Sequence, residues 1–461
     1  TVREARWWRF FAVLLSLSLV VAACGDDDEG ASTDDTEAPD EGGGDGGGDD
    51  GGEIDLGEEV EVAEGTVLPL PDCPSDWDPE TGLTEDSIKI AMSLPESGPV
   101  AALGGLDDGM RAWFDQMEPI DGRSIELVSA DDAYDPARTL SNTEDFLAND
   151  EPFALTFMVG TPNILAIRDL THEECVPQLF NSTGFPAWGD PANYPWTIGG
   201  LLGYNTEAEL WCRYITDEIG EGTTVAALYM DNDFGASYEE TMNGCETVEI
   251  VESVRHDPAA TAVTDEVTTL AASDADVAIL GTTGAACPQA MAAIAQSSWD
   301  PETFLSYTCQ GIPTYFQPID PAGEGVIVAT SAKEAGELDD PAVQEARQVL
   351  EDAGLNPDEG SFYTGVIFGQ TVELLFRQAA EMDGGLNRVN LMKATWNADF
   401  SVPLGLEGAT WKTDGVNDAY GVEAAQFARY VPPAEGEELG TYEPIGDLTN
   451  LEGESGSYEG G

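Results

Sequence analysis

The sequence predicts an α/β fold with two doubly wound parallel-sheet lobes joined by a hinge. Between residues 86 and 431, short apolar strands alternate with helical segments. Near-continuous apolar strands separated by helices are typical of parallel sheets that helices cover on both faces. The strand–helix repeats are too many for one sheet of ordinary width, so two lobes fit better than one barrel. A length of 461 residues, 42% of them hydrophobic, is also comfortable for two domains.

The expected strands are short and mostly apolar, and helical patterns fill the gaps between them. Asp135 followed by Pro136 predicts one helix start, because Asp caps helix N-termini and Pro is favoured at the first helical position. Strands are expected at residues 87–92, 124–130, 153–159, 176–180, 224–230, 248–252, 277–280 and 303–307. Helices are expected at residues 100–117, 136–146, 285–296 and 342–352, among others.

The charge balance excludes several classes of function. With 17 Lys and Arg against 89 Asp and Glu, the formal net charge is −72. Nucleic-acid binding needs basic residues that displace counterions, and attachment to anionic lipid needs a basic patch. His172 and His256 are the two histidines, which leaves little material for a histidine metal site or a His-based triad. The catalytic motifs GxSxG and HExxH and the Walker loop are also missing, and GxGxxG occurs only within the low-complexity Gly/Asp run at 42–52, so we expect neither an enzyme nor a bound metal or cofactor.

The N-terminal segment predicts export. Basic residues precede an apolar run at 10–23, which is shorter than the roughly 20 residues of a spanning helix and suits a signal peptide. The run ends in Val21-Ala22-Ala23-Cys24, which resembles a bacterial lipobox. We therefore expect a lipoprotein signal peptide at 1–23 and lipidation of Cys24. A non-lipidated signal or an uncleaved anchor are the alternatives.

Composition divides the rest of the chain. Residues 24–65 are rich in Asp, Glu and Gly and predict an acidic tether that holds a folded domain off the membrane. Residues 66–85 would be a lead-in segment, and residues 432–461 a flexible acidic tail with few apolar anchors. The expected location is therefore extracytoplasmic, tethered to the cell membrane.

The cysteines agree with an exported protein. Apart from Cys24 there are six, and an even number outside the cytoplasm suggests three disulfides, for which 15 connectivities exist. Local order favours Cys287–Cys309 and Cys212–Cys245, each on neighbouring elements. Cys73–Cys175 then follows by exclusion.

Several segments, in this order along the chain, resemble the type I periplasmic binding proteins. They are IKIAMSLPESGPVAALGG, SADDAYDPARTL, MVGTPN, CVPQLFNSTGFP, VAALYMDNDFGASYEE, ADVAILGTTGAACPQAMAAI, FLSYTCQGI and YTGVIFGQTVELLFRQA. Among these proteins the chain is most similar to branched-chain amino acid and amide receptors of ABC importers. The resemblance spans about residues 86–430 and implies three crossovers, with one lobe at 86–205 and 335–400 and the other at 206–334 and 401–431. Ligand would lie in the cleft at the carboxyl ends of the strands.

Two loops are candidate ligand contacts on physical grounds. Gly160-Thr161-Pro162-Asn163 and Asn181-Ser182-Thr183-Gly184 each follow a strand and lead toward a helix. Backbone N–H groups at a helix N-terminus can bind a carboxylate or another acceptor. We expect contacts from Thr161, Asn163, Ser182, Thr183 and Gly184. Ordinary helix capping is the alternative, because Ser, Thr and Asn are favoured there in any case.

The resemblance adds further candidates and one departure. From the first lobe it adds Ser97, Gly98 and Leu103, and from the second lobe Phe234, Thr282, Thr283 and Gln310. Relatives that bind amino acids usually carry an acidic residue at the place of Gln310, where it pairs with the ligand ammonium. An unpaired buried ammonium would cost several kcal/mol. Either Asp231 or Asp233 supplies the charge, or the ligand is an amide, a urea-like compound or a carboxylate without an α-amino group.

The combined prediction is a monomeric solute-binding lipoprotein. It would capture a small polar ligand, such as an amino acid, an amide or a small carboxylate, by lobe closure and deliver it to the permease of an ABC importer. One alternative is a receptor domain that signals through a separate partner. Another is a lipid-anchored hydrolase that uses Asp and Glu residues, such as Asp131, Asp132 and Asp135. We favour a strand end and a helix cap for those three residues.

Overall fold

The computed structural model describes residues 54–458, with gaps at 261, 359–360 and 437–438. The expected signal peptide, the lipidation site Cys24 and most of the tether therefore lie outside the described residues. All described residues belong to one compact unit. Among the described helices, none has both the length and the apolar character needed to cross a membrane.

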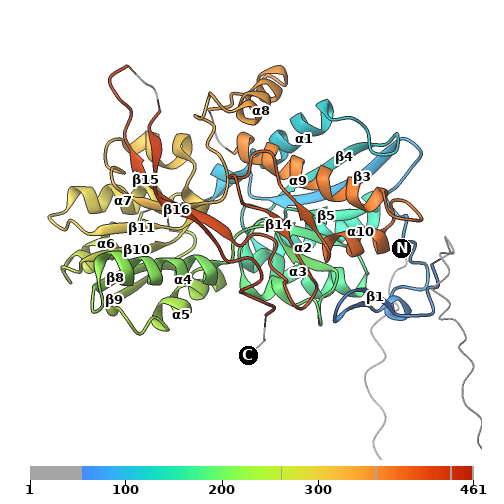
Figure 1. The fold of residues 1–461 in the computed structure, drawn as a ribbon, viewed down its shortest axis with the longest axis horizontal. Helices are drawn as coiled ribbons and strands as arrows, with labels where there is room; N and C mark the ends of the chain where they lie inside the picture. Colours follow the sequence, from blue (N-terminus) through green and yellow to red (C-terminus); the bar gives the residue numbers. More distant parts are fainter. Residues whose placement is uncertain (1–53, 261, 359–360, 437–438, 459–461) are drawn as a thin grey trace, which may run out of the picture. The chain divides into compact units, whose positions relative to one another are not determined.

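The first lobe contains a five-stranded parallel sheet (Figure 1). Its strand order is β4-β3-β5-β6-β7, so the chain starts inside the sheet and moves outward in both directions. The strands are β3 (Ser87–Leu94), β4 (Ser124–Asp131), β5 (Ala154–Thr156), β6 (Gln178–Asn181) and β7 (Thr197–Gly199). The helices that follow or cover them are α1 (Leu106–Gln116), α2 (Pro136–Asp145) and α3 (Thr161–Glu173).

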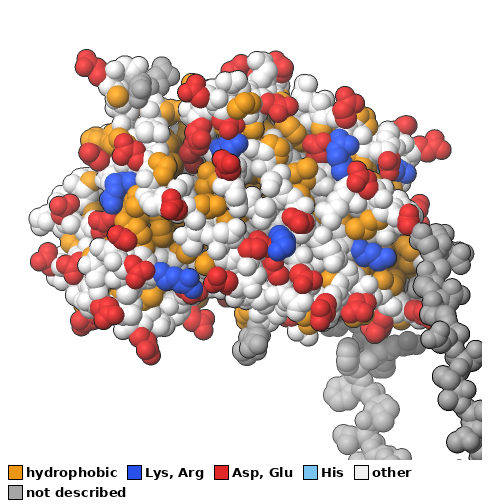
Figure 2. All heavy atoms as spheres, in the orientation of Figure 1, with side chains coloured by type: hydrophobic (Ala, Val, Ile, Leu, Met, Phe, Trp, Pro, Cys, Tyr) orange, Lys and Arg blue, Asp and Glu red, His pale blue; other side chains and the backbone are white. Residues whose placement is uncertain are grey.

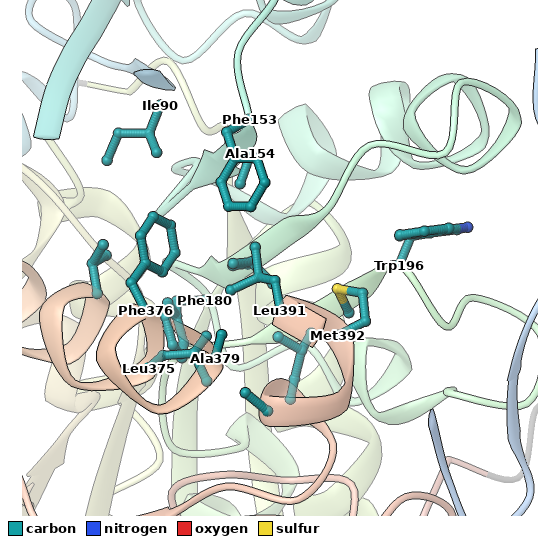
Figure 3. Close-up of a cluster of buried hydrophobic side chains, with 14 of the residues drawn as sticks. Ile90, Phe153, Ala154, Phe180, Trp196, Leu375, Phe376, Ala379, Leu391 and Met392 are labelled. Atoms are coloured by element: carbon teal, nitrogen blue, oxygen red, sulfur yellow. The ribbon is translucent and has the colours of Figure 1, made fainter. Parts of the chain in front are cut away.

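The C-terminal part of the chain returns to complete this lobe. Helices α8 (Pro341–Asp352), α9 (Phe362–Ala380) and α10 (Arg388–Thr395) belong to it, with the small hairpin β13 (Asp399–Phe400) and β14 (Trp411–Lys412). In Figure 3, Leu375, Phe376 and Ala379 of α9 lie in one apolar cluster with Phe153 and Ala154 at β5. Helix α9 also crosses α1 closely, since a Cβ on Gly365 would lie 2.2 Å from the carbonyl oxygen of Leu106.

The second lobe contains a seven-stranded sheet of order β16-β15-β12-β11-β10-β8-β9. The five strands from β12 to β9 are parallel, and β15 and β16 add to their edge in antiparallel fashion. The strands are β8 (Thr224–Met230), β9 (Glu249–His256), β10 (Val277–Gly281), β11 (Glu302–Leu305), β12 (Ile327–Thr330), β15 (Ala424–Val431) and β16 (Thr441–Asn450). The helices are α4 (Tyr204–Tyr214), α5 (Asp233–Asn243), α6 (Thr264–Ala271) and α7 (Ala286–Gln296).

The structure corrects two expectations about the ends of the folded region. Residues 432–461 are not a loose tail throughout, because β16 pairs with β15 and the Tyr442 ring packs against Phe316 and Tyr430. The predicted tether also ends earlier than residue 65. Strands β1 (Val60–Ala63) and β2 (Thr66–Leu68) form a hairpin with buried side chains in the core of the first lobe. Aromatic and aliphatic anchors at every second or third position hold both segments in place.

The six described cysteines form three disulfides. Cys73 pairs with Cys175 and ties the lead-in segment to the end of α3; the two Cα atoms are 5.6 Å apart. In the second lobe Cys212 pairs with Cys245, and Cys287 with Cys309. The latter two are the pairs that local order in the sequence favours, and the first is the pair that follows by exclusion.

The surface is dominated by acidic side chains. Figure 2 shows Asp and Glu spread over the visible face, with Lys and Arg in small, separate groups. Several of the basic side chains are engaged in ion pairs, such as Arg255 with Asp231 and Arg429 with Glu302. The visible face therefore offers no continuous basic patch, in agreement with the net charge.

Candidate functional site

A cavity of about 170 Å³ lies between the two lobes, and we call it the central cavity. Its first-lobe lining includes Thr161, which follows β5, and Ser182, which follows β6. Its second-lobe lining includes Phe234 after β8, Thr283 after β10 and Gln310 after β11. The carboxyl ends of parallel strands from both sheets therefore meet at this cavity, where open α/β sheets generally bind ligands. On a comparable measure, a ~150 Å³ cavity holds benzene.

The central cavity includes part of the predicted site. Leu103, Thr161, Ser182, Phe234, Thr283 and Gln310 line it. Ser97, Gly98, Asn163, Thr183, Gly184 and Thr282 are not among the lining residues.

The predicted residues of the two strand-end loops that do not line the cavity make contacts that hold these loops in place. The Thr183 hydroxyl lies 2.6 Å from that of Thr161, and the Asn163 amide donates to the Thr139 hydroxyl at 2.8 Å. Gly184 packs so closely that a Cβ there would lie 2.0 Å from the carbonyl oxygen of Leu202. These residues fix the loops whose neighbours reach the cavity.

In the second lobe, the Thr282 side chain forms a hydrogen bond with a histidine. Its hydroxyl lies 2.7 Å from Nε2 of His256, which ends β9, and both side chains are buried. Burial lowers the pKa of His256, which favours the neutral ring. Thr282 therefore joins the ends of β10 and β9, which lie on either side of β8, and is not among the residues that line the cavity.

Ser97 and Gly98 belong to the loop after β3, whose later residues Ala102 and Leu103 line the cavity. The Ser97 hydroxyl donates to Oδ2 of Asp131 at 2.6 Å, outside the cavity. Farther along this loop, the carbonyl of Pro99 accepts a hydrogen bond from the N–H of Ala285, in the second lobe, at 3.2 Å. Val100 packs against Gly284, where a Cβ would lie 2.5 Å from Val100 Cγ1. The loop thus connects the two lobes directly.

Sequence reasoning missed the tyrosines of the central cavity. Tyr134, Tyr204, Tyr307, Tyr315 and Tyr363 all line it, together with Phe368. Burial raises the pKa of each tyrosine, that of Tyr204 to about 12, so all five hydroxyls are neutral near pH 7. They can donate as well as accept hydrogen bonds.

Three of these tyrosines, Tyr134, Tyr307 and Tyr363, stand in segments that carry the family resemblance. Tyr134 lies in the DDAY segment, and its N–H donates to the Asp132 carboxylate at 2.8 Å in a left-handed backbone conformation with φ 63°. Gly160 makes room for the ring, since a Cβ there would lie 2.6 Å from Tyr134 Cε2. Asp132 is buried and also accepts from Ser93 and Thr139, which supports the structural role predicted for it.

Three polar atoms of lining residues are buried without a hydrogen-bond partner in the described part of the chain. They are Oε1 of Gln310 and the hydroxyls of Tyr315 and Tyr363. Leaving a buried polar group unpaired costs about 1–3 kcal/mol. A ligand with polar groups at this end of the cavity would remove that penalty.

A second cavity of about 120 Å³ adjoins the first, and we call it the side cavity. The two share Leu201, Tyr307, Gln310 and Phe368 among their lining residues. The side cavity adds mainly apolar and aromatic residues, namely Phe157, Leu202, Val402, Trp411 and Val422. Together the cavities suit a molecule with a polar end and an apolar body.

Neither aspartate considered as a replacement for the missing acid lines the central cavity. Asp231 is largely exposed and pairs with Arg255 at 3.1 Å, and Asp233 begins α5. The acidic residue among the lining residues is Glu334, on the crossover that follows β12. Among the described residues, no group of His, Cys, Asp and Glu side chains is arranged to hold a metal ion.

Comparisons with known proteins agree with this geometry. A branched-chain amino acid ABC transporter protein from Thermus thermophilus with bound valine matches at TM-score 0.69 and 16% identity, covering 80% of this chain and 97% of that one. A fatty acid ABC transporter substrate-binding protein from Thermomonospora curvata matches at TM-score 0.67 and 18% identity, covering 80% and 95%. A solute-binding protein of an ABC transporter from R. palustris, in complex with 4-hydroxybenzoate, matches at TM-score 0.65 and 16% identity, covering 79% and 97%.

At these identities the structural matches establish the fold. A comparison with curated protein sequences finds no match. The family model for periplasmic binding proteins matches residues 87–427, which is most of the chain and nearly all of both lobes. The chain therefore belongs to the periplasmic binding protein family.

Proposed function

We propose that this protein captures a small ligand between its lobes and delivers it to the permease of an ABC importer. The observation that carries the proposal is the central cavity, which draws lining residues from the strand ends of both sheets. Ligand held there contacts both lobes at once, so binding favours the closed arrangement. Structural neighbours named as binding proteins of ABC transporters support the importer as the destination.

The lining favours a ligand with a polar end and an apolar body. Gln310, Tyr315 and Tyr363 offer polar atoms without partners, whereas Phe368 and the side cavity offer apolar surface. Amino acids with large side chains, their amides and small carboxylates have this character. Valine and 4-hydroxybenzoate, which are bound in two of the structural neighbours, are comparable in size to these compounds.

The proposed location is outside the cytoplasmic membrane, with a lipid on Cys24 as the anchor. Support comes from the lipobox-like sequence and from the pairing of all six described cysteines, since disulfides persist in oxidising compartments. Metabolic labelling with a fatty acid would test the anchor, and Cys24→Ala should abolish the label.

Ligand-dependent melting of the mature protein tests the binding function. The panel holds branched-chain and aromatic amino acids, short amides, urea, small carboxylates and 4-hydroxybenzoate, after unfolding and refolding to strip carried-over ligand. A ligand at 100 times its Kd should add about 2.7 kcal/mol of stability. Ligand recovered unchanged after long incubation would support binding and argue against a hydrolase.

A matched pair of variants locates the site. Ser182→Ala removes a hydroxyl from the cavity lining, whereas Ser97→Ala removes one that bonds to Asp131 outside it. We expect Ser182→Ala to weaken binding about 3- to 10-fold, the value of one hydrogen bond, and Ser97→Ala to leave the affinity unchanged. The opposite ranking would place the ligand elsewhere.

A further inference from the structure

The crossover after β12 brings one acidic side chain into the lining of the central cavity. This residue, Glu334, lines the cavity together with Tyr363, Gln310 and the basic residue Lys333. Its neighbours along the chain are anchored: the N–H of Lys333 donates to the carbonyl of Leu404 at 2.8 Å, and the carbonyl of Ala335 accepts from Arg347 at 3.0 Å. The backbone on either side of Glu334 is therefore fixed.

The Glu334 carboxylate has no hydrogen bond or ion pair with any other described residue. The two nearest basic residues in sequence are committed elsewhere, Lys333 to Asp340 at 2.9 Å and Arg347 to Asp358 at 2.6 Å. Desolvation raises the pKa of Glu334 to about 8, with a smaller contribution from Glu337. Without a cation beside it the group is therefore mostly protonated near pH 7, and a cation placed there would stabilise the charged form.

Gln310 and Tyr363, which line the same cavity as Glu334, carry oxygen atoms that can accept hydrogen bonds. After burial, the charge of Glu334 is the largest cause that raises the pKa of both Tyr363 and Tyr442, so it lies within electrostatic reach of both rings. The Tyr442 hydroxyl in turn donates to the backbone carbonyl of Gln310 at 2.6 Å. Oε1 of Gln310 and the hydroxyl of Tyr363 are buried without partners among the described residues. An ammonium, with three N–H donors and a positive charge, matches this set of acceptors.

We propose that Glu334 pairs with a cationic amine of the ligand and so supplies the charge that Gln310 cannot. The inference rests on the proposed function and narrows its ligand class. The acid reaches the cavity from the crossover between the lobes rather than from the second-lobe strand end where an acid was expected. The bound molecule therefore carries an ammonium or amidinium group.

Ligand pairs that differ only in the ammonium group test this inference by calorimetric titration of the mature protein. The probes are L-valine with isovalerate, and L-phenylalanine with 3-phenylpropionate, plus 2-phenylethylamine as a cation without a carboxylate. We expect the ammonium-bearing members to bind at least about tenfold more tightly, as a charge-assisted hydrogen bond supplies. Equal or tighter binding of the members without ammonium would overturn the inference while leaving the binding function intact.

Variants separate Glu334 from acidic residues outside the cavity. Glu334→Gln keeps the shape but removes the charge, and should lower the affinity for the ammonium-bearing probe by about 10- to 100-fold. Glu345→Gln removes a charge from the exposed face of α8, outside the cavity lining, and should leave the affinity unchanged. Unchanged binding by Glu334→Gln would overturn the assignment. If no probe bound the wild-type protein, both this inference and the amino-acid form of the proposed function would fall.

Discussion

The burial of Glu207 predicts how the stability of the protein depends on pH, because its carboxyl group is fully buried. The group accepts a hydrogen bond from the Tyr238 hydroxyl at 2.6 Å and another from the N–H of Tyr307 at 2.9 Å. No positively charged side chain is among the causes that act on its pKa. Burial outweighs the two hydrogen bonds and raises the pKa of Glu207 to about 8.

The sign of the pH dependence follows from this shift. Between about pH 4.5, the ordinary value, and pH 8, the folded protein retains a proton that the unfolded chain releases. The free energy of unfolding must therefore fall as pH rises through this window and level off above pH 8. At about 1.36 kcal/mol per pH unit the whole interval corresponds to about 5 kcal/mol. Structural relaxation and water entry reduce such penalties, so we expect roughly 2–4 kcal/mol.

Urea unfolding of Glu207→Gln and wild type at pH 5 and pH 8.5 measures this contribution. The amide is neutral at both pH values and keeps an oxygen for the N–H of Tyr307. We expect the variant to gain roughly 2–4 kcal/mol on wild type between pH 5 and pH 8.5. Glu209→Gln is the matched control, because this exposed residue lies on the same helix and pairs with Arg213. If the two variants showed the same pH dependence, the burial argument for Glu207 would be wrong.

Further predictions concern the cavity, its mouth and the longest disulfide loop. Gly160→Ala should weaken ligand binding at least about tenfold in calorimetric titration, because the new methyl group would displace the ring of Tyr134. Gly284→Val should also weaken binding by preventing closure at the mouth, while circular dichroism shows both lobes still folded. Replacing Cys73 and Cys175 by Ser opens a loop of sequence separation 102 and should lower the free energy of urea unfolding by about 2–4 kcal/mol.

The sequence predicts the parallel strands well because their apolar runs are buried on both faces. The expected strand 224–230 matches β8, and Asp135 caps α2 as expected by accepting from the N–H of Ala137. The error at the C-terminal end has a physical cause. Residues 441–450 read as polar because β16 is an edge strand, with most of its side chains exposed or half-buried, and Tyr442 provides much of its anchoring.

For the site, the sequence identifies loops better than side chains. Strand ends followed by Gly, Ser, Thr or Asn mark where the backbone turns, and Thr161 and Ser182 indeed line the cavity. Whether a given side chain faces the cavity or its own loop depends on packing that spacing does not encode, as Thr183 shows. Tyr363 lies outside the loop patterns altogether, because it belongs to α9, which comes from a distant part of the chain.

The contacts between the two lobes can be weighed against the buried polar atoms that lack protein partners in the central cavity. Direct contact across the mouth includes one backbone hydrogen bond, from Ala285 to Pro99, and the packing of Val100 on Gly284. Against these contacts stand the unpartnered atoms of Gln310, Tyr315 and Tyr363, each of which costs about 1–3 kcal/mol while it is buried without water. Opening hydrates these atoms, and a polar ligand satisfies them without opening. In the proposed binding cycle, the residues that contact the ligand therefore also shift the balance between open and closed forms.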